Sequence, residues 1–184
     1  MPGQTEKRKL SHEEIQASKP SVEAVKKMAR MPLTVVLDNL RSLHNVGAIF
    51  RTADAISAEK LYLCGITGKP PRKEITKAAL GATEVVPWEY EASTRETLLK
   101  LKEKGVKICA LELCRESVDY AEFDYQFPMA LVVGNEVSGI SENVMDLVDD
   151  AVMIPMLGRA NSLNVATSFG IAGYEILKKW RKNN

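Results

Sequence analysis

Short runs of aliphatic and β-branched residues alternate along this chain with segments whose apolar residues recur at helical spacing. The runs predict strands at 33–37, 60–64, 84–86, 106–111, 129–133 and 151–154. The periodic segments predict helices around Arg51 and at 74–80, 93–104 and 163–180. Strands joined by helices pair in parallel, because each helix is a crossover connection. The sequence therefore predicts an α/β fold with a mostly parallel sheet flanked by helices.

The length of 184 residues suits one globular domain, and 45% hydrophobic residues are enough for its core. Before the first expected strand, residues 11–14 have the form of a helical capping box, and a second short helix is expected to start near Ser21, after Pro20. We therefore expect a short N-terminal helical extension at 1–31 and one main domain at 32–184.

The formal net charge of +1 excludes strong long-range attraction of nucleic acid by the whole protein, so RNA binding has to use local patches. One basic cluster consists of Lys69, Arg72, Lys73 and Lys77, and a second lies at 178–182. An ordinary solvated surface explains both clusters equally well when they are considered alone.

The three cysteines are odd in number and form no CxxC pair, which favours neither a disulfide framework nor a metal site. No apolar run approaches the roughly 20 residues that a membrane-spanning helix needs, and no apolar segment follows the charged N-terminus. We therefore expect a cytoplasmic protein with reduced thiols, no bound metal and no membrane partner.

Arg51 lies on a helical face that otherwise carries small residues. Gly47, Arg51 and Ala55 are spaced four apart, so they stack on one face of the helix. Such small neighbours allow a ligand or another backbone to approach closely. Ordinary helix packing explains this face about as well as a binding site does.

A second segment, 131–141, runs from an apolar strand into a glycine turn that holds Glu136. Ligands bind beyond the carboxyl ends of the strands in α/β sheets, so this turn is a candidate cofactor edge. The chain contains neither a GxGxxG dinucleotide motif nor a P-loop. A tight strand-to-helix turn with Ser141 as the N-cap is the ordinary alternative.

A third segment, 154–166, repeats the arrangement of strand, irregular loop and helix start. Ser162 is a suitable N-cap for the final helix. Asn164 gains little as a helix former in the first turn, so its side chain is a candidate for facing a ligand.

Together the three segments resemble the three motifs of the SpoU/TrmH family of RNA ribose 2′-O-methyltransferases, within the SPOUT superfamily. The first matches as Asn45-x-Gly47-x-x-x-Arg51, the second as Gly134-Asn135-Glu136 followed by Gly139, and the third as Ile154-Pro155-Met156 with Ser162-Leu163-Asn164-Val165. The order and the separations of the motifs also fit, and the resemblance covers residues 33–180.

The resemblance implies S-adenosylmethionine as the cofactor and a set of site residues. Around the reacting ribose it implies Arg51 as the central catalytic residue, with Asn45, Glu136, Ser162 and Asn164. Contacts to the cofactor are implied at Leu111, Gly134, Ile154, Met156, Ser162 and Leu163, of which Leu111 is anchored by no motif. We expect contacts to RNA at Lys69, Arg72, Lys73 and Arg159.

The resemblance also implies a SPOUT-type fold with a C-terminal deep trefoil knot, which makes residues 32–184 the catalytic domain. It implies a homodimer that uses the final helix, with the site completed near the interface. Ala166, Gly170 and Gly173 form a ridge of small residues on that helix, and an intramolecular contact explains the ridge as well. We expect tRNA, more than rRNA, as the substrate.

Methyl transfer needs the acceptor oxygen in line with the sulfonium–methyl bond, so positioning supplies much of the rate. A guanidinium keeps its proton far above neutral pH, and Arg51 is therefore expected to act as a fixed cation that stabilises developing negative charge. Ser162 and Asn164 are expected to orient the hydroxyl. Glu136 either pairs with Arg51 or holds its own loop.

Three functional classes stay open at this point: an active RNA 2′-O-methyltransferase, a catalytically silent knotted RNA-binding protein, and a different α/β enzyme with similar turns. The joint presence of Asn45, Arg51, Ser162 and Asn164 favours the first class. Within that class, rRNA remains the alternative substrate.

Overall fold

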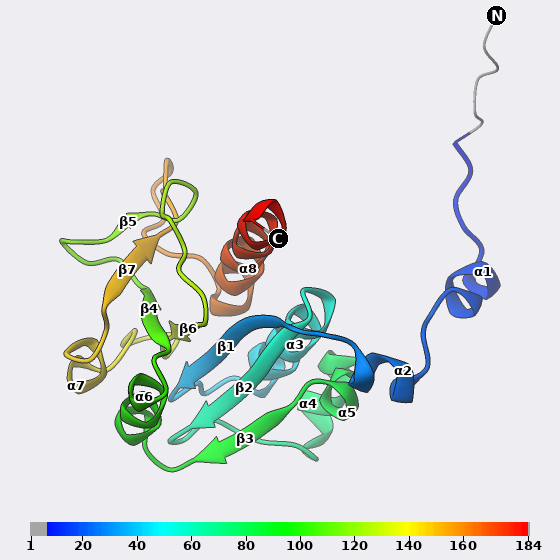
Figure 1. The fold of residues 1–184 in the computed structure, drawn as a ribbon, viewed down its shortest axis with the longest axis horizontal. Coiled ribbons are helices and arrows are strands. Elements are labelled where there is room, and N and C mark those ends of the chain that lie inside the picture. Colours follow the sequence, from blue (N-terminus) through cyan, green and yellow to red (C-terminus); the bar gives the residue numbers. More distant parts are fainter. Residues whose placement is uncertain (1–6, 184) are drawn as a thin grey trace, which may run out of the picture.

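The computed structural model describes residues 7–183 and contains one seven-stranded sheet (Figure 1). The strand order is β3-β2-β1-β6-β4-β7-β5, and every neighbouring pair is parallel. The strands are β1 Met31–Asp38, β2 Ala58–Cys64, β3 Trp88–Glu91, β4 Lys107–Leu111, β5 Val118–Asp119, β6 Met129–Val133 and β7 Asp150–Met153. The predicted α/β fold with a parallel sheet is confirmed.

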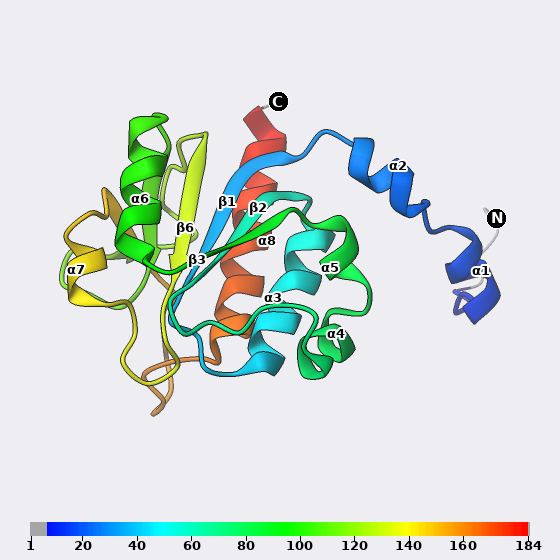
Figure 2. The same ribbon diagram turned by 90° about the horizontal axis from the view of Figure 1, so that it is seen from below.

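Helices cover both faces of the sheet. They are α1 His12–Ala17, α2 Val22–Lys27, α3 Leu43–Ala55, α4 Lys73–Ala79, α5 Ala82–Val85, α6 Thr94–Glu103, α7 Glu142–Met145 and α8 Val165–Asn183. Figure 2 shows α3, α4, α5 and α8 on one side of the sheet and α6 and α7 on the other. Within residues 7–183, no helix combines the length and the apolar character needed to cross a membrane.

The inner strand β1 is buried on both faces and contributes to two hydrophobic cores. Leu33 and Leu37 pack in the core that contains Phe50 of α3, whereas Val36 packs with Leu98 of α6. Successive side chains of a strand point to opposite faces, which explains this division. Because all strands run in parallel, their carboxyl ends lie at a single edge of the sheet.

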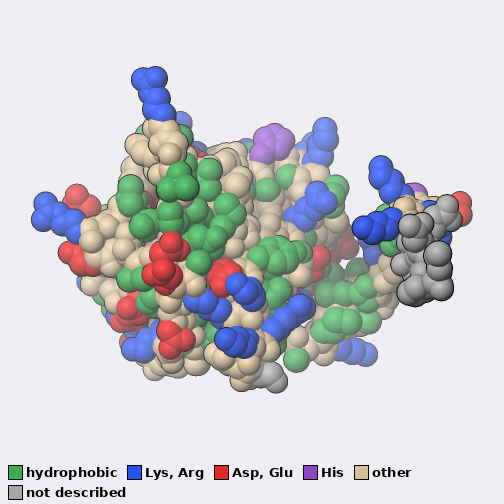
Figure 3. Space-filling model, turned by 90° about the horizontal axis from the view of Figure 1, so that it is seen from above, with side chains coloured by type: hydrophobic (Ala, Val, Ile, Leu, Met, Phe, Trp, Pro, Cys, Tyr) green, Lys and Arg blue, Asp and Glu red, His purple; other side chains and the backbone are tan. Residues whose placement is uncertain are grey.

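Helix α1 stands away from the body of the protein (Figures 1 and 3), whereas α2 contacts α5. Neither α1 nor α2 buries a residue, and Ser11 and Ser21 cap them as the sequence predicts. Arg30 marks the place where this arm joins the body. Its guanidinium donates to the backbone oxygen of Ala58 at 3.2 Å and to that of Val85 at 2.6 Å.

One predicted strand is wrong and one strand was not predicted. The segment 84–86 belongs to helix α5 and its C-cap, and the strand of this region is β3, at Trp88–Glu91. Leu80 and Gly81 both take a positive φ, which ends α4 and begins α5 immediately afterwards. The short strand β5 lies in a segment for which the sequence predicts no regular element.

Two glycines of the predicted binding faces are used for packing inside the protein. A Cβ on Gly47 would lie 2.6 Å from both the Cβ of Ala78 and the backbone oxygen of Ile75, so this glycine lets α3 approach α4. Gly173 is buried, and a Cβ there would lie 3.0 Å from the Cδ1 of Ile56. For these two positions, helix packing is the correct explanation.

Candidate active site

A groove of about 1040 Å³ opens at the carboxyl ends of β4, β6 and β7. All six residues for which the sequence predicts cofactor contacts line it: Leu111, Gly134, Ile154, Met156, Ser162 and Leu163. Glu136, Asn164 and Arg159 line it as well. The second and third motifs therefore form the walls of one groove, although Glu136 and Ser162 are far apart in the sequence.

The loop after β6 is closed on itself by backbone hydrogen bonds. The amide of Asn135 donates to the backbone oxygen of Gly139 at 2.9 Å, and the amide of Gly139 donates back at 3.0 Å. A Cβ on Gly134 would overlap the backbone of Gly139 and Ile140, and Gly139 itself has a φ of 68°. Glycine is therefore required at both positions for the tight turn that forms one groove wall.

Glu136 extends from this loop to the start of α3. Its carboxylate accepts hydrogen bonds from the backbone amides of Arg41 and Ser42, both at 3.0 Å, and from Nδ2 of Asn45 at 2.9 Å. Partial burial raises the pKa of Glu136, but these hydrogen bonds outweigh it, and the pKa lies below its ordinary value. Glu136 thus joins the second motif to the first.

Asn164 joins the third motif to the same network. Its Nδ2 donates to Oδ1 of Asn45 at 3.0 Å, and its Oδ1 accepts from the amides of Ala166 at 3.0 Å and Thr167 at 3.3 Å. Asn164 is therefore the N-cap of α8. The sequence indicates Ser162 for this role, as the alternative to ligand binding. Ser162 is exposed and lines the groove.

Two predicted site residues of the first motif, Asn45 and Arg51, do not line the groove. Asn45 is hydrogen-bonded to the groove residues Glu136 and Asn164, whereas Arg51 has no such link within residues 7–183. Arg51 is exposed on α3. Six residues of helix separate it from Asn45, which corresponds to roughly 9 Å along the axis. Among the described residues, Arg51 makes no hydrogen bond or ion pair, so Glu136 binds the start of α3 rather than this guanidinium.

The other predicted RNA-contact residues follow β2 and lie at the same edge of the sheet as the groove. Lys69 is in the loop after β2, with its Nζ 4.1 Å from the ring centre of Tyr90. Arg72 is the N-cap of α4, and Lys73 is its first residue; both side chains are exposed. These three residues therefore lie beyond the carboxyl end of β2, whereas the groove lies beyond the carboxyl ends of β4, β6 and β7.

Sequence reasoning missed two carboxylates that support the groove. Asp38 ends β1 and is fully buried, and Glu112 follows β4 directly. Glu112 accepts a hydrogen bond from the amide of Ile140 at 3.0 Å and so holds the loop after β6 from the other side. A signal was available, because each residue is a carboxylate placed immediately after a buried strand.

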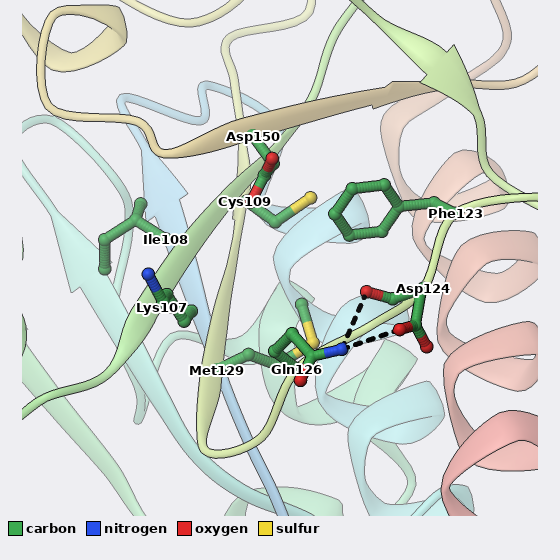
Figure 4. A pocket seen from close by; sticks show the side chains of 8 residues that line it. All are labelled: Lys107, Ile108, Cys109, Phe123, Asp124, Gln126, Met129 and Asp150. Atoms are coloured by element: carbon green, nitrogen blue, oxygen red, sulfur yellow. Dashed lines mark hydrogen bonds between the residues drawn. The ribbon is translucent and has the colours of Figure 1, made fainter.

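A second, smaller cavity of about 190 Å³ lies at the opposite edge of the sheet (Figure 4). It is lined by Lys107, Met129 and Asp150, the first residues of β4, β6 and β7. Cys109 also lines it, and burial raises the pKa of this thiol to about 12. None of the predicted site residues lies there, and Cys109 is a free cysteine.

The chain is similar to known RNA methyltransferases over most of its length. The sequence pattern of the SpoU rRNA Methylase family matches residues 32–174. The tRNA (guanosine(18)-2′-O)-methyltransferase of Aquifex aeolicus is 39% identical over 145 residues, which are 78% of this chain and 67% of that protein.

Solved structures show the same likeness. The A. aeolicus TrmH/SpoU tRNA modifying enzyme superposes with a TM-score of 0.80 and 34% identity, over 88% of this chain and 83% of that one. An AdoMet-bound rRNA methyltransferase from Sinorhizobium meliloti gives a TM-score of 0.75 and 32% identity, over 84% of this chain and 59% of that one. The family match includes all three motifs, and the chain therefore belongs to the SpoU rRNA methylase family.

Proposed function

We propose that this protein is an S-adenosylmethionine-dependent methyltransferase that methylates a ribose 2′-hydroxyl in RNA, and that its RNA is tRNA rather than rRNA. The observation that carries the proposal is the hydrogen-bonded chain Glu136–Asn45–Asn164, which joins all three motifs beside one groove. The tRNA preference is supported by the A. aeolicus relative, whose name specifies guanosine 18 of tRNA.

The groove fits the cofactor. Ligand pockets for molecules of this size have volumes of about 300–1000 Å³, and the groove here is of that order. Glycine at 134 and 139 brings main-chain groups to its wall, which suits hydrogen bonding to an adenosine. When bound, S-adenosylmethionine supplies a methyl group activated by a sulfonium. The six residues predicted for cofactor contact, at 111, 134, 154, 156, 162 and 163, are the ones proposed to hold it.

The polar residues beside the groove are proposed to position the ribose. Asn45 donates a hydrogen bond from Nδ2 to Glu136 and accepts one at Oδ1 from Asn164. The orientation of both asparagine side chains is therefore fixed before RNA binds. Ser162 is exposed at the groove and free to orient the 2′-hydroxyl. Fixed donors and acceptors of this kind lower the barrier because no reorganisation is needed during transfer. The hydroxyl proton leaves to water or to an RNA phosphate.

Arg51 is proposed to act in the groove of a second copy of the chain. Its exposure and its distance along α3 from Asn45 support a contribution across a homodimer interface. The final helix α8 packs beside α3 and leaves Tyr174 54% exposed, and a Cβ on Gly170 would meet open space. In that position the guanidinium stabilises negative charge on the ribose oxygen and the adjacent phosphate.

The same proposal covers the organisation of the chain. Residues 1–31 are taken as an N-terminal extension and 32–184 as the catalytic domain, because α1 and α2 bury no residue. A deep trefoil knot is proposed for the C-terminal part. It is supported by the path from β7, which lies next to the edge strand β5, to α8, which contacts α3 beyond β4 and β6. We propose that the enzyme acts in the cytoplasm.

Methyl transfer from labelled S-adenosylmethionine to purified tRNA and, separately, to rRNA tests the proposal. We expect label in tRNA with wild-type protein and much less with Asn164→Ala. Label in rRNA alone would change the substrate class, and no label in either RNA while the cofactor binds would favour a silent RNA-binding protein.

A further inference from the structure

Asp38 is a fully buried carboxylate that no cofactor or RNA contact explains. Its Oδ1 accepts hydrogen bonds from Nδ2 of Asn39 at 2.9 Å and from Oγ1 of Thr94 at 2.6 Å. Its Oδ2 accepts from the amide and from the hydroxyl of Ser141, both at 2.8 Å. Four donors from the end of β1, the start of α6 and the start of α7 thus converge on one carboxylate.

The four donors require a carboxylate at this position. The hydroxyls of Thr94 and Ser141 can reverse and accept, but the amide of Ser141 and Nδ2 of Asn39 cannot. The Asn39 side chain is fixed in this orientation because its Oδ1 accepts from the amide of Ile66 at 3.1 Å. Each carboxylate oxygen of Asp38 thus accepts from one nitrogen that can only donate: Nδ2 of Asn39 for Oδ1 and the amide of Ser141 for Oδ2. An asparagine at 38 would therefore direct its NH₂ group at a donor in either of its two orientations.

Ser141 shows that this contact is specific. It occupies the N-cap position of α7, yet its side chain makes no capping hydrogen bond and donates to Asp38 instead. The serine predicted as an ordinary cap therefore serves to attach the loop after β6 to β1.

Asp38 and its neighbour Asn39 hold the loop 134–141, which forms one wall of the groove, at both of its ends. Ser141 ends the loop whose residues Gly134, Glu136 and Gly139 line the groove, so Asp38 fixes the far end of that loop. Asn39, the neighbour of Asp38, accepts a hydrogen bond at its backbone oxygen from Nδ2 of Asn135 at 2.7 Å, which fixes the near end.

We propose that Asp38 is a positioning residue for the cofactor groove: through Ser141 and Asn39 it holds the loop 134–141 in the shape that binds S-adenosylmethionine. This inference rests on the proposed function. Loss of the carboxylate leaves donors buried without acceptors, and the loop then moves to find other partners. The consequence is weaker cofactor binding, because the groove wall is no longer fixed before the ligand arrives.

The test compares Asp38→Asn and Ser141→Ala with Ser141→Thr, which keeps a hydroxyl, and with Thr97→Ala. Thr97 is a buried threonine one turn further along α6, and its hydroxyl donates to the backbone oxygen of Ser93 at 2.8 Å without touching Asp38. Its substitution therefore lowers stability in the same helix and serves as the matched control. Cofactor affinity is measured by titration calorimetry, at a temperature at which circular dichroism shows each variant to be folded.

We expect Asp38→Asn to raise the Kd for S-adenosylmethionine at least about tenfold and Ser141→Ala to raise it about threefold to fivefold. Ser141→Thr and Thr97→Ala are expected to stay within about twofold of the wild type. Hydrogen exchange of the peptide 135–141 is expected to accelerate in Asp38→Asn and Ser141→Ala but not in Thr97→Ala.

A folded Asp38→Asn protein with wild-type affinity would overturn the inference, and so would an equal loss of affinity in Thr97→Ala. If Asp38→Asn does not fold, the comparison of Ser141→Ala with Ser141→Thr decides in its place. Failure of the wild-type protein to bind S-adenosylmethionine would instead contradict the proposed function, so the two failures are distinguishable.

Discussion

Asn164 donates a hydrogen bond from Nδ2 to Oδ1 of Asn45 over 3.0 Å, although the two residues are 119 positions apart in the chain. The same Asn164 caps α8, and the same Asn45 donates to Glu136. The start of the final helix and the start of α3 are therefore fixed by one pair of amide side chains. This relationship allows the structural and the catalytic contributions of Asn164 to be separated by mutation.

Asn164→Ala is expected to lose both the cap and the link to Asn45. The lost cap lowers the free energy of unfolding by about 1 kcal/mol, and the lost link lowers methyl transfer. Asn164→Ser is the matched control, because serine is a good N-cap but its short side chain does not reach Asn45. We expect Asn164→Ser to recover the stability, measured by urea denaturation, without recovering the methyl-transfer rate. Full activity in Asn164→Ser would show that the amide link is not needed.

Arg51 is expected to act across a dimer interface, and mixed dimers test this directly. Arg51→Ala and Asn164→Ala are each expected to be nearly inactive as homodimers. In a heterodimer of the two, one groove is intact and receives the arginine of the other chain, so one of the two sites should work. Co-purification with two different tags isolates the heterodimer for the transfer assay. A heterodimer as inactive as its parents would mean that Arg51 acts within its own chain.

Gly47→Ala is expected to destabilise the protein, because its Cβ would lie 2.6 Å from the backbone oxygen of Ile75. Overpacking of this kind costs about 1–3 kcal/mol of unfolding free energy. Gly158→Ala is the control, since its Cβ would meet nothing within 4 Å and its φ is not in the left-handed region. Urea denaturation should therefore show a loss of stability in Gly47→Ala and little change in Gly158→Ala, and a Gly47→Ala protein as stable as the wild type would contradict the packing described.

Glu136 is expected to make the stability of the protein depend on pH. Its pKa is lowered in the folded state, so its ionised form stabilises the fold above the unfolded glutamate pKa of about 4.3. This contribution disappears as the pH falls through the lowered pKa of the folded state. Glu136→Gln has no such titration, and the difference in Tm between wild type and variant should shrink as the pH is lowered through this range. Parallel Tm profiles of the two proteins would exclude this role of the carboxylate.

The sequence predicts the fold well where periodicity is regular and fails where turn conformation decides. The alternation of apolar runs and helical segments correctly predicts β1, β6 and α8. The β-branched residues Val85 and Val86 misled the prediction of a strand at 84–86, because left-handed Leu80 and Gly81 start a short helix there instead. The strand propensity of individual residues predicts secondary structure poorly where the backbone conformation of a preceding turn determines which element follows.

For the candidate site, side-chain types and motif spacing indicate which residues gather at the groove, but not what they bind. Glu136 was a candidate partner for Arg51, and the partners it has are two backbone amides and Asn45. Backbone partners cannot be deduced from residue type, since every residue except proline offers the same amide. Asp38 directly follows the apolar run 33–37, which marks it as a candidate, but its contact with Ser141, 103 positions away, cannot be deduced from the sequence.

The most direct measurement of the central claim is the chemical position of the transferred methyl group. Wild-type protein is incubated with S-adenosylmethionine and tRNA, and the RNA is digested to nucleosides for mass spectrometry. We predict a nucleoside that carries the new methyl on its ribose. A methyl group found on a base would contradict the account, because a groove built around Asn45, Ser162 and Asn164 is then not arranged for a ribose hydroxyl.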